Sequence, residues 1–80
     1  IGQTLASKRL GQASEAIGNL DAETASANAS SLEKASAAIA DSNIEELRAA
    51  AASLDTSNEA LSEIAGYITD AANALQSYKK

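Results

Sequence analysis

The sequence predicts an all-α fold, and three of its features point to this class. Alanine, the residue with the highest helix propensity, occurs 20 times among the 80 residues. Proline is absent, and the β-branched and aromatic residues that favour strands are few. Apolar residues recur at intervals of three and four along much of the chain, a spacing typical of helices rather than of disordered segments.

The first half of the chain is predicted to be a helical arm over about residues 3–40. Its apolar residues step by three and four in two runs, and the step widens to five after Leu20. Gly18 is a typical residue for the end of a helix, and Asp21 is a typical N-cap for a new one. We therefore expect a kink or break near residues 18–21.

The strongest turn signal lies at the midpoint, in the run Ala40-Asp41-Ser42-Asn43. Ser42 followed by Glu45 fits a capping box, in which each side chain accepts a hydrogen bond from the other residue's backbone N–H. A turn near 41–43 leaves a second helical arm over about residues 43–78. Each arm then has about 35 residues and is roughly 50 Å long. Because the connection is short, the two arms are expected to be antiparallel neighbours.

The second arm carries the most regular apolar pattern of the chain. Steps of three and four connect Ile44, Leu47, Ala51, Leu54, Asn58, Leu61, Ala65, Ile68, Ala72 and Leu75. This seam is an a/d heptad pattern. Asn58 keeps the register, so we interpret the arm as one continuous helix with a polar residue that fixes register or partner number. The alternative is a new helix that begins at the capping box formed by Thr56 and Glu59.

These elements predict a single helical domain over residues 1–80. The expected architecture is a long antiparallel helical hairpin, and the alternative is a three- or four-helix bundle. A two-helix hairpin encloses no core, and eight leucines and six isoleucines are all the large aliphatic residues that the chain has. We therefore expect the chain to bury its apolar surface against a partner, most simply as a homo-oligomer.

The predicted interface consists of the seam and its edge. Ile64, Tyr67 and Tyr78 lie at that edge, and the two tyrosines are the only aromatic residues, a type enriched in binding hot spots. The full set is Ile44, Leu47, Leu54, Asn58, Leu61, Ile64, Tyr67, Ile68, Leu75 and Tyr78. Gly66 beside Ala65 is interpreted as a close helix contact.

The composition argues against several classes of function. With no histidine and no cysteine, the chain lacks the commonest general base, the thiol nucleophile and the usual zinc ligands. The four glycines are scattered and form no phosphate-binding loop. We therefore expect no catalytic residues, no metal, no cofactor and no small-molecule substrate. A net charge of −5 opposes nucleic-acid binding, and no apolar run is long enough to span a membrane.

The predicted hairpin is similar in architecture to the helical-hairpin subunits of secretion needles and pili, although needle subunits usually turn at a proline-containing loop. The resemblance implies assembly into an oligomer or helical filament, at the cell surface or outside the cell. The leading hypothesis is therefore a non-enzymatic structural subunit that self-associates through helices lined by alanine and leucine. The alternative is a secreted or surface helical module that binds another protein.

Overall fold

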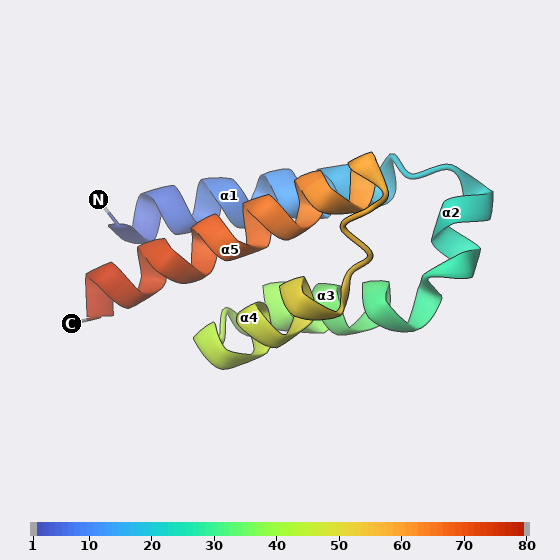
Figure 1. Cartoon of the computed structure of the whole chain (residues 1–80). Helices are drawn as coiled ribbons and strands as arrows, with labels where there is room; N and C mark the ends of the chain where they lie inside the picture. Colours follow the sequence, from blue (N-terminus) through green and yellow to red (C-terminus); the bar gives the residue numbers. More distant parts are fainter. Residues whose placement is uncertain (1, 80) are drawn as a thin grey trace.

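Five helices make up the part of the chain that the structure describes. The computed structural model describes the backbone of residues 2–79 and the side chains of residues 5–77. The helices are α1 (Gly2–Gly18), α2 (Ala22–Ala27), α3 (Ala29–Asp41), α4 (Ile44–Ser53) and α5 (Glu59–Lys79) (Figure 1). Because no strand occurs within residues 2–79, the predicted all-α class is confirmed.

The four longer helices alternate in direction. α1 packs against α5, α5 against α4, and α4 against α3, and each pair is antiparallel (Figure 1). The α2 region and the linker between α4 and α5 join the α1–α5 pair to the α3–α4 pair, and both lie at the same end of the molecule. The four longer helices thus form a bundle, which is closer to the predicted alternative, whereas the long two-arm hairpin is not confirmed.

The break expected near residues 18–21 is present. α1 ends at Gly18, and the Asn19 N–H donates to the carbonyl oxygens of Glu15 and Ala16, which closes the last turn. α2 follows as a helix of six residues, none of them buried. Segment 19–28, which contains α2, therefore contributes no fully buried residue and packs against the core through the partly buried Leu20 and Ala25.

The turn between α3 and α4 also lies where the sequence predicts it. Ser42 has a φ of 52°, in the left-handed region, and its N–H donates to the Ala38 carbonyl oxygen at 2.9 Å. The predicted cap at Ser42 is wrong by one residue, because the left-handed residue that ends α3 cannot also cap α4. Asn43 caps α4 instead, since its side-chain oxygen accepts a hydrogen bond from the Glu46 N–H at 3.0 Å.

The predicted continuous helix through Asn58 is wrong. α4 ends at Ser53, and residues 54–58 form a linker from which α5 starts in the opposite direction (Figure 1). Within the linker, the Asp55 carboxylate accepts hydrogen bonds from the Ser57 N–H and hydroxyl group at 3.1 and 2.5 Å. These two bonds hold the pKa of Asp55 below its ordinary value.

Asn58 is the N-cap residue of α5 rather than a polar residue inside a seam. Its side-chain oxygen accepts hydrogen bonds from the Ala60 and Leu61 N–H groups at 3.0 and 3.2 Å. These donors have no partner inside the helix, and asparagine is among the best residues for satisfying them. Thr56, the cap in the alternative interpretation, is exposed and lies two residues before the cap that forms.

Replacing Asn58 by alanine is expected to lower the free energy of unfolding by about 1 kcal/mol, because the cap of α5 is lost. Asn58→Leu removes the same cap and is expected to lower the free energy of unfolding as well. A continuous helix predicts that Asn58→Leu raises it, since leucine would add an apolar residue to the seam. Urea denaturation of both variants at low protein concentration measures the change. Stabilisation by leucine would contradict the capping role of Asn58.

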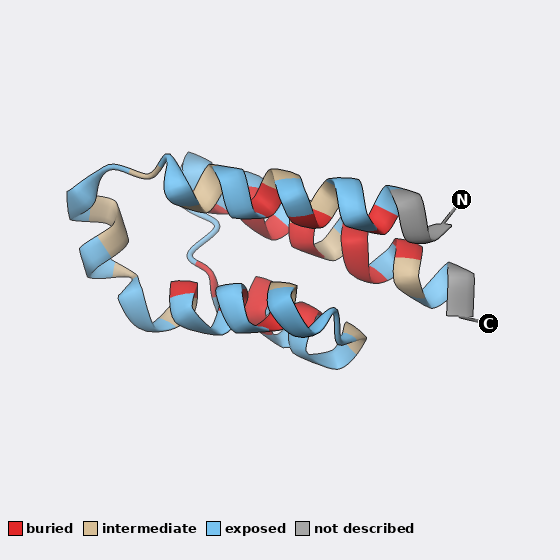
Figure 2. Ribbon diagram, turned by 180° about the vertical axis from the view of Figure 1, so that it is seen from behind, coloured by how far each residue is buried: buried red, intermediate tan, exposed pale blue. Residues whose placement is uncertain are grey.

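The buried residues lie on the sides of the helices that face one another (Figure 2). Among residues 5–77, ten of the seventeen buried apolar residues are alanines, so the helix backbones approach closely. The largest fully buried side chains, on α4 and α5, are Leu47, Leu61, Ile64 and Ile68. No polar or charged residue is buried among residues 5–77.

The dimensions show that one chain closes this core by itself. The radius of gyration is 11.7 Å, close to the value of about 12 Å expected for a compact chain of this length. The longest dimension is 39 Å, shorter than the roughly 50 Å of a two-arm hairpin. Within residues 5–77, Leu5 is the one exposed large apolar residue, at 43% exposure. The fold therefore covers most of the large apolar side chains of residues 5–77 without a partner.

Candidate interaction groove between α4 and α5

The structure places most of the predicted interface inside the chain. The residues buried in the core are Leu47, Leu54, Leu61, Ile64 and Ile68, and the half-buried ones are Ile44, Asn58, Tyr67 and Leu75. The side chain of Tyr78 lies outside the described residues. The seam thus packs α4 against α5 of the same chain, and its use between chains stays a prediction.

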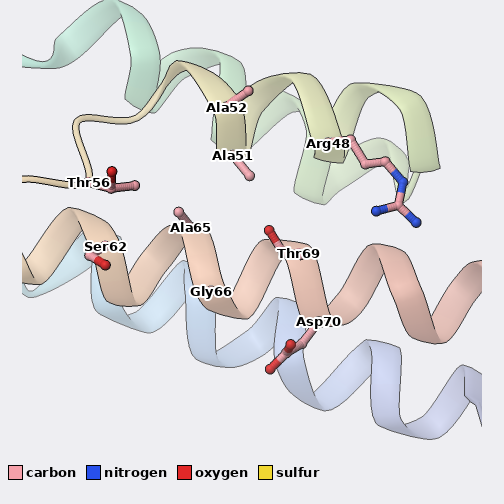
Figure 3. A pocket seen from close by; sticks show the side chains of 9 residues that line it. All are labelled: Arg48, Ala51, Ala52, Thr56, Ser62, Ala65, Gly66, Thr69 and Asp70. Carbon is pink, nitrogen blue, oxygen red and sulfur yellow. The ribbon is translucent and has the colours of Figure 1, made fainter.

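An open groove of about 500 Å³ lies between α4 and α5 on the outside of this packing (Figure 3). Small side chains form most of its wall, and one charged residue of each helix completes it. The lining residues are Arg48, Ala51, Ala52, Thr56, Ser62, Ala65, Gly66, Thr69 and Asp70. The groove exists because the chain folds back at the linker, which brings the small-residue faces of both helices together.

Gly66 keeps the middle of the groove open. A Cβ atom built at this position meets no atom within 4 Å, and the residue is exposed. The close helix contact expected at Gly66 is therefore not made within the chain. Glycine destabilises a helix interior by roughly 0.5–1 kcal/mol relative to alanine. Gly66 therefore leaves the groove free of a side chain at its middle, and α5 is less stable for it.

The charged residues of the groove already have partners in the chain. The Arg48 guanidinium donates a hydrogen bond from Nη2 to Oε1 of Gln76 at 2.5 Å, which links α4 to the last part of α5. Oδ2 of Asp70 lies 3.8 Å from Nε of Arg9 on α1, a partly exposed ion pair of small energetic value. The remaining lining is small and uncharged, so the groove suits an apolar protein surface better than a charged ligand.

A second hollow, of about 370 Å³, lies between α3 and α4 beside two carboxyl groups. The interaction of Glu46 with the Asp41 side chain raises the pKa of Glu46 above its ordinary value. Lys34 lines the same hollow. All three residues are exposed, whereas catalytic groups owe their shifted pKa values to burial as well as to charged neighbours. Within the described residues, no group of three or more potential ligands is placed to hold a metal ion.

Sequence reasoning missed the groove because it missed the fold-back at residues 54–58. A signal is present, since Asp55-Thr56-Ser57-Asn58 has the same kind of turn and cap residues as the midpoint run, which predicts a turn correctly. Arg48, Thr69 and Asp70 had no predicted role, because a continuous helix would hold α4 and α5 end to end instead of side by side.

No protein-family model, curated protein or solved structure matches this chain, so no activity or partner is carried over from a relative. Among the helices of residues 2–79, none combines the length and the apolar character that crossing a membrane requires.

Proposed function

We propose that this chain is a non-enzymatic helical domain that binds another protein by accepting a helix in the groove between α4 and α5. The single observation that carries the proposal is the groove itself, an exposed hollow between two helices whose lining is mostly alanine, glycine, serine and threonine. Large apolar side chains of a partner helix fit between such small residues as knobs fit into holes.

The chemistry of the groove also describes the partner. Its small, mostly uncharged wall calls for an amphipathic helix with leucine-sized residues at intervals of three and four. The chain carries a net charge of −5, so a partner helix flanked by lysine and arginine gains complementary charge and a faster encounter.

Filling the groove at Gly66 tests the proposal. Gly66→Gln adds a long polar side chain in open space and replaces glycine by a better helix former, so the fold is expected to be retained. Gly11→Gln is the matched control, because Gly11 is also exposed, helical and free of neighbours around its Cβ position. Peptides for the binding measurement are selected against the unchanged chain from a library of amphipathic helices with basic flanks.

We expect the selected peptides to bind the unchanged chain and Gly11→Gln equally, and to lose about tenfold in affinity or more for Gly66→Gln, a loss of about 1.4 kcal/mol. Calorimetric titration measures the affinities, and circular dichroism checks that both variants stay helical. Equal binding to all three proteins, or failure to select any binder, contradicts the proposal.

A second candidate function is self-association as a structural subunit, which would build oligomers or filaments and would act in secreted or surface assemblies. The observation that favours it is the seam, whose heptad spacing continues from α4 to α5 across the linker. Such spacing is typical of helices long enough to pair between chains. Sedimentation equilibrium over a wide concentration range tests this candidate, for which we expect the mean mass to rise with concentration. A constant monomer mass contradicts it.

A further inference from the structure

We propose that the α3–α4 hairpin exchanges between two copies of this chain, so that it packs on the α1–α5 pair of the other copy. In the exchanged form, α4 and α5 become one continuous helix, as the heptad seam predicts for this arm. This inference rests on the second candidate function, self-association, and adds the route by which it occurs. Exchange of identical elements is a route to dimers that needs no new interface.

The linker at residues 54–58 has the properties of a hinge. It contains neither glycine nor proline, so no residue in it breaks a helix outright, and its turn and cap residues lower the helix propensity only modestly. Leu54 and Leu61 border this region seven positions apart and are both buried. If the linker becomes helical, these two residues stay on the same face, and α4 and α5 present one uninterrupted apolar seam.

The second connection between the two helix pairs can open at the same time. Segment 19–28 contains α2, which has no buried residue. It leaves the molecule at the same end as the 54–58 linker (Figure 1). The α3–α4 hairpin can therefore swing away as a unit without pulling α1 from α5 or breaking its own turn.

The exchanged dimer would reuse the contacts that hold the monomer together. α4 packs on α5 through the buried seam residues and through the hydrogen bond between Arg48 and Gln76. The same surfaces are available when α4 comes from a second copy, so both forms bury the same apolar side chains. The two forms differ at the hinge. In the monomer, which we call the closed form, the hinge has the Asn58 cap and the bonds of Asp55. In the exchanged dimer, which we call the open form, it has continuous helical hydrogen bonds.

A variant that favours the open hinge tests the inference. Asp55→Ala combined with Asn58→Ala removes the local bonds of the closed linker and introduces the best helix former, without altering the chain length or the apolar residues of the seam. We expect the dimerisation constant to rise by about tenfold or more, since each copy loses its cap in the closed form only. Size-exclusion chromatography with light scattering measures the mass over a concentration series.

Asn43→Ala is the matched control. Asn43 caps α4 with the same chemistry as Asn58 caps α5, but the α3–α4 turn that it belongs to stays intact in both forms. Its loss therefore destabilises the closed and the exchanged form equally, and we expect no change in the dimerisation constant.

Thiol cross-linking shows which chain supplies α4. The chain has no cysteine, so Arg48→Cys with Gln76→Cys places one thiol on each of two exposed positions that contact each other across α4 and α5. A short bifunctional thiol reagent then links the two positions within one chain in the closed monomer. In an exchanged dimer it links two chains, which a denaturing gel separates from the monomer.

The inference is supported if the hinge variant forms dimers that cross-link between chains while Asn43→Ala does not. It is overturned if the hinge variant stays monomeric, or if its dimers cross-link only within chains, a result that leaves self-association standing. Should circular dichroism show the hinge variant to be unfolded, the double-cysteine chain refolded at high concentration decides the matter by the same two cross-linking outcomes. An unchanged chain that stays monomeric at every concentration overturns the inference for this chain together with self-association, even if the hinge variant exchanges.

Discussion

Replacing Leu61 by alanine is expected to destabilise the chain by about 2–5 kcal/mol, a large part of the stability of so small a domain. Leu61 is fully buried in the first turn of α5, beside the linker and within the core cluster that α4 and α5 share. The loss of stability has two parts. The protein loses the favourable free energy of burying the removed groups, and a cavity is left among neighbours that relax only partly. Chemical denaturation followed by circular dichroism measures the change.

Leu5→Ala is the control for this result, because Leu5 is 43% exposed on α1 and has the same side chain. Its loss is expected to change the stability by about 0.5 kcal/mol or less, as for most surface positions. Equal effects of the two substitutions would mean that α5 does not bury Leu61 in a core closed by this chain.

The second large effect is expected from Ala71→Leu. Ala71 is fully buried on α5, in a core where more than half of the buried residues are alanines. A leucine has no room where the helix backbones approach closely, and overpacking of this kind typically destabilises by about 1–3 kcal/mol. The same denaturation experiment measures it.

Ala60→Leu is the matched control on the same helix, since Ala60 is exposed in the first turn of α5. We expect it to leave the free energy of unfolding nearly unchanged. If Ala71→Leu were tolerated as well as Ala60→Leu, the tight alanine packing of α5 would be contradicted.

Much of the fold could be predicted because local chemistry decides it. Helix propensity and apolar spacing identify the class, and Gly18 and the run ending at Asn43 mark two of the connections. The pairing of α3 with α4 also follows from the turn, and the Ser31 hydroxyl donates to the Ser53 carbonyl oxygen at the register that a hairpin about residue 42 requires. These features depend on residues close together in sequence.

The fold-back at residues 54–58 could not be decided by spacing alone. Leu54 and Leu61 are seven positions apart whether the residues between them form two helical turns or a linker, so the heptad pattern fits both forms. The capping residue was also misplaced, because asparagine at position 58 competes with Thr56 and is the stronger cap. The groove between α4 and α5 depends on this fold-back and could therefore not be predicted from the sequence.

The same ambiguity affects the predicted interface. Side chains that could pair two chains in a long hairpin instead pair two helices of one chain, as Leu47 and Ile68 do. The sequence pattern specifies which faces become buried. It does not specify whether the partner face comes from the same copy, because both arrangements satisfy the same apolar surfaces.

The central claim is that a single chain folds back at residues 54–58 and places α4 beside α5. Spin labels at Arg48→Cys and Gln76→Cys measure it most directly, through the distance between them in a dilute sample at low micromolar concentration, where the chain is expected to be monomeric. The two residues contact each other across the helices, so a label distance of about 20 Å or less is expected, within the 20 Å width of the molecule. A continuous helix separates positions 28 residues apart by about 42 Å, and a distance near that value would contradict the fold-back.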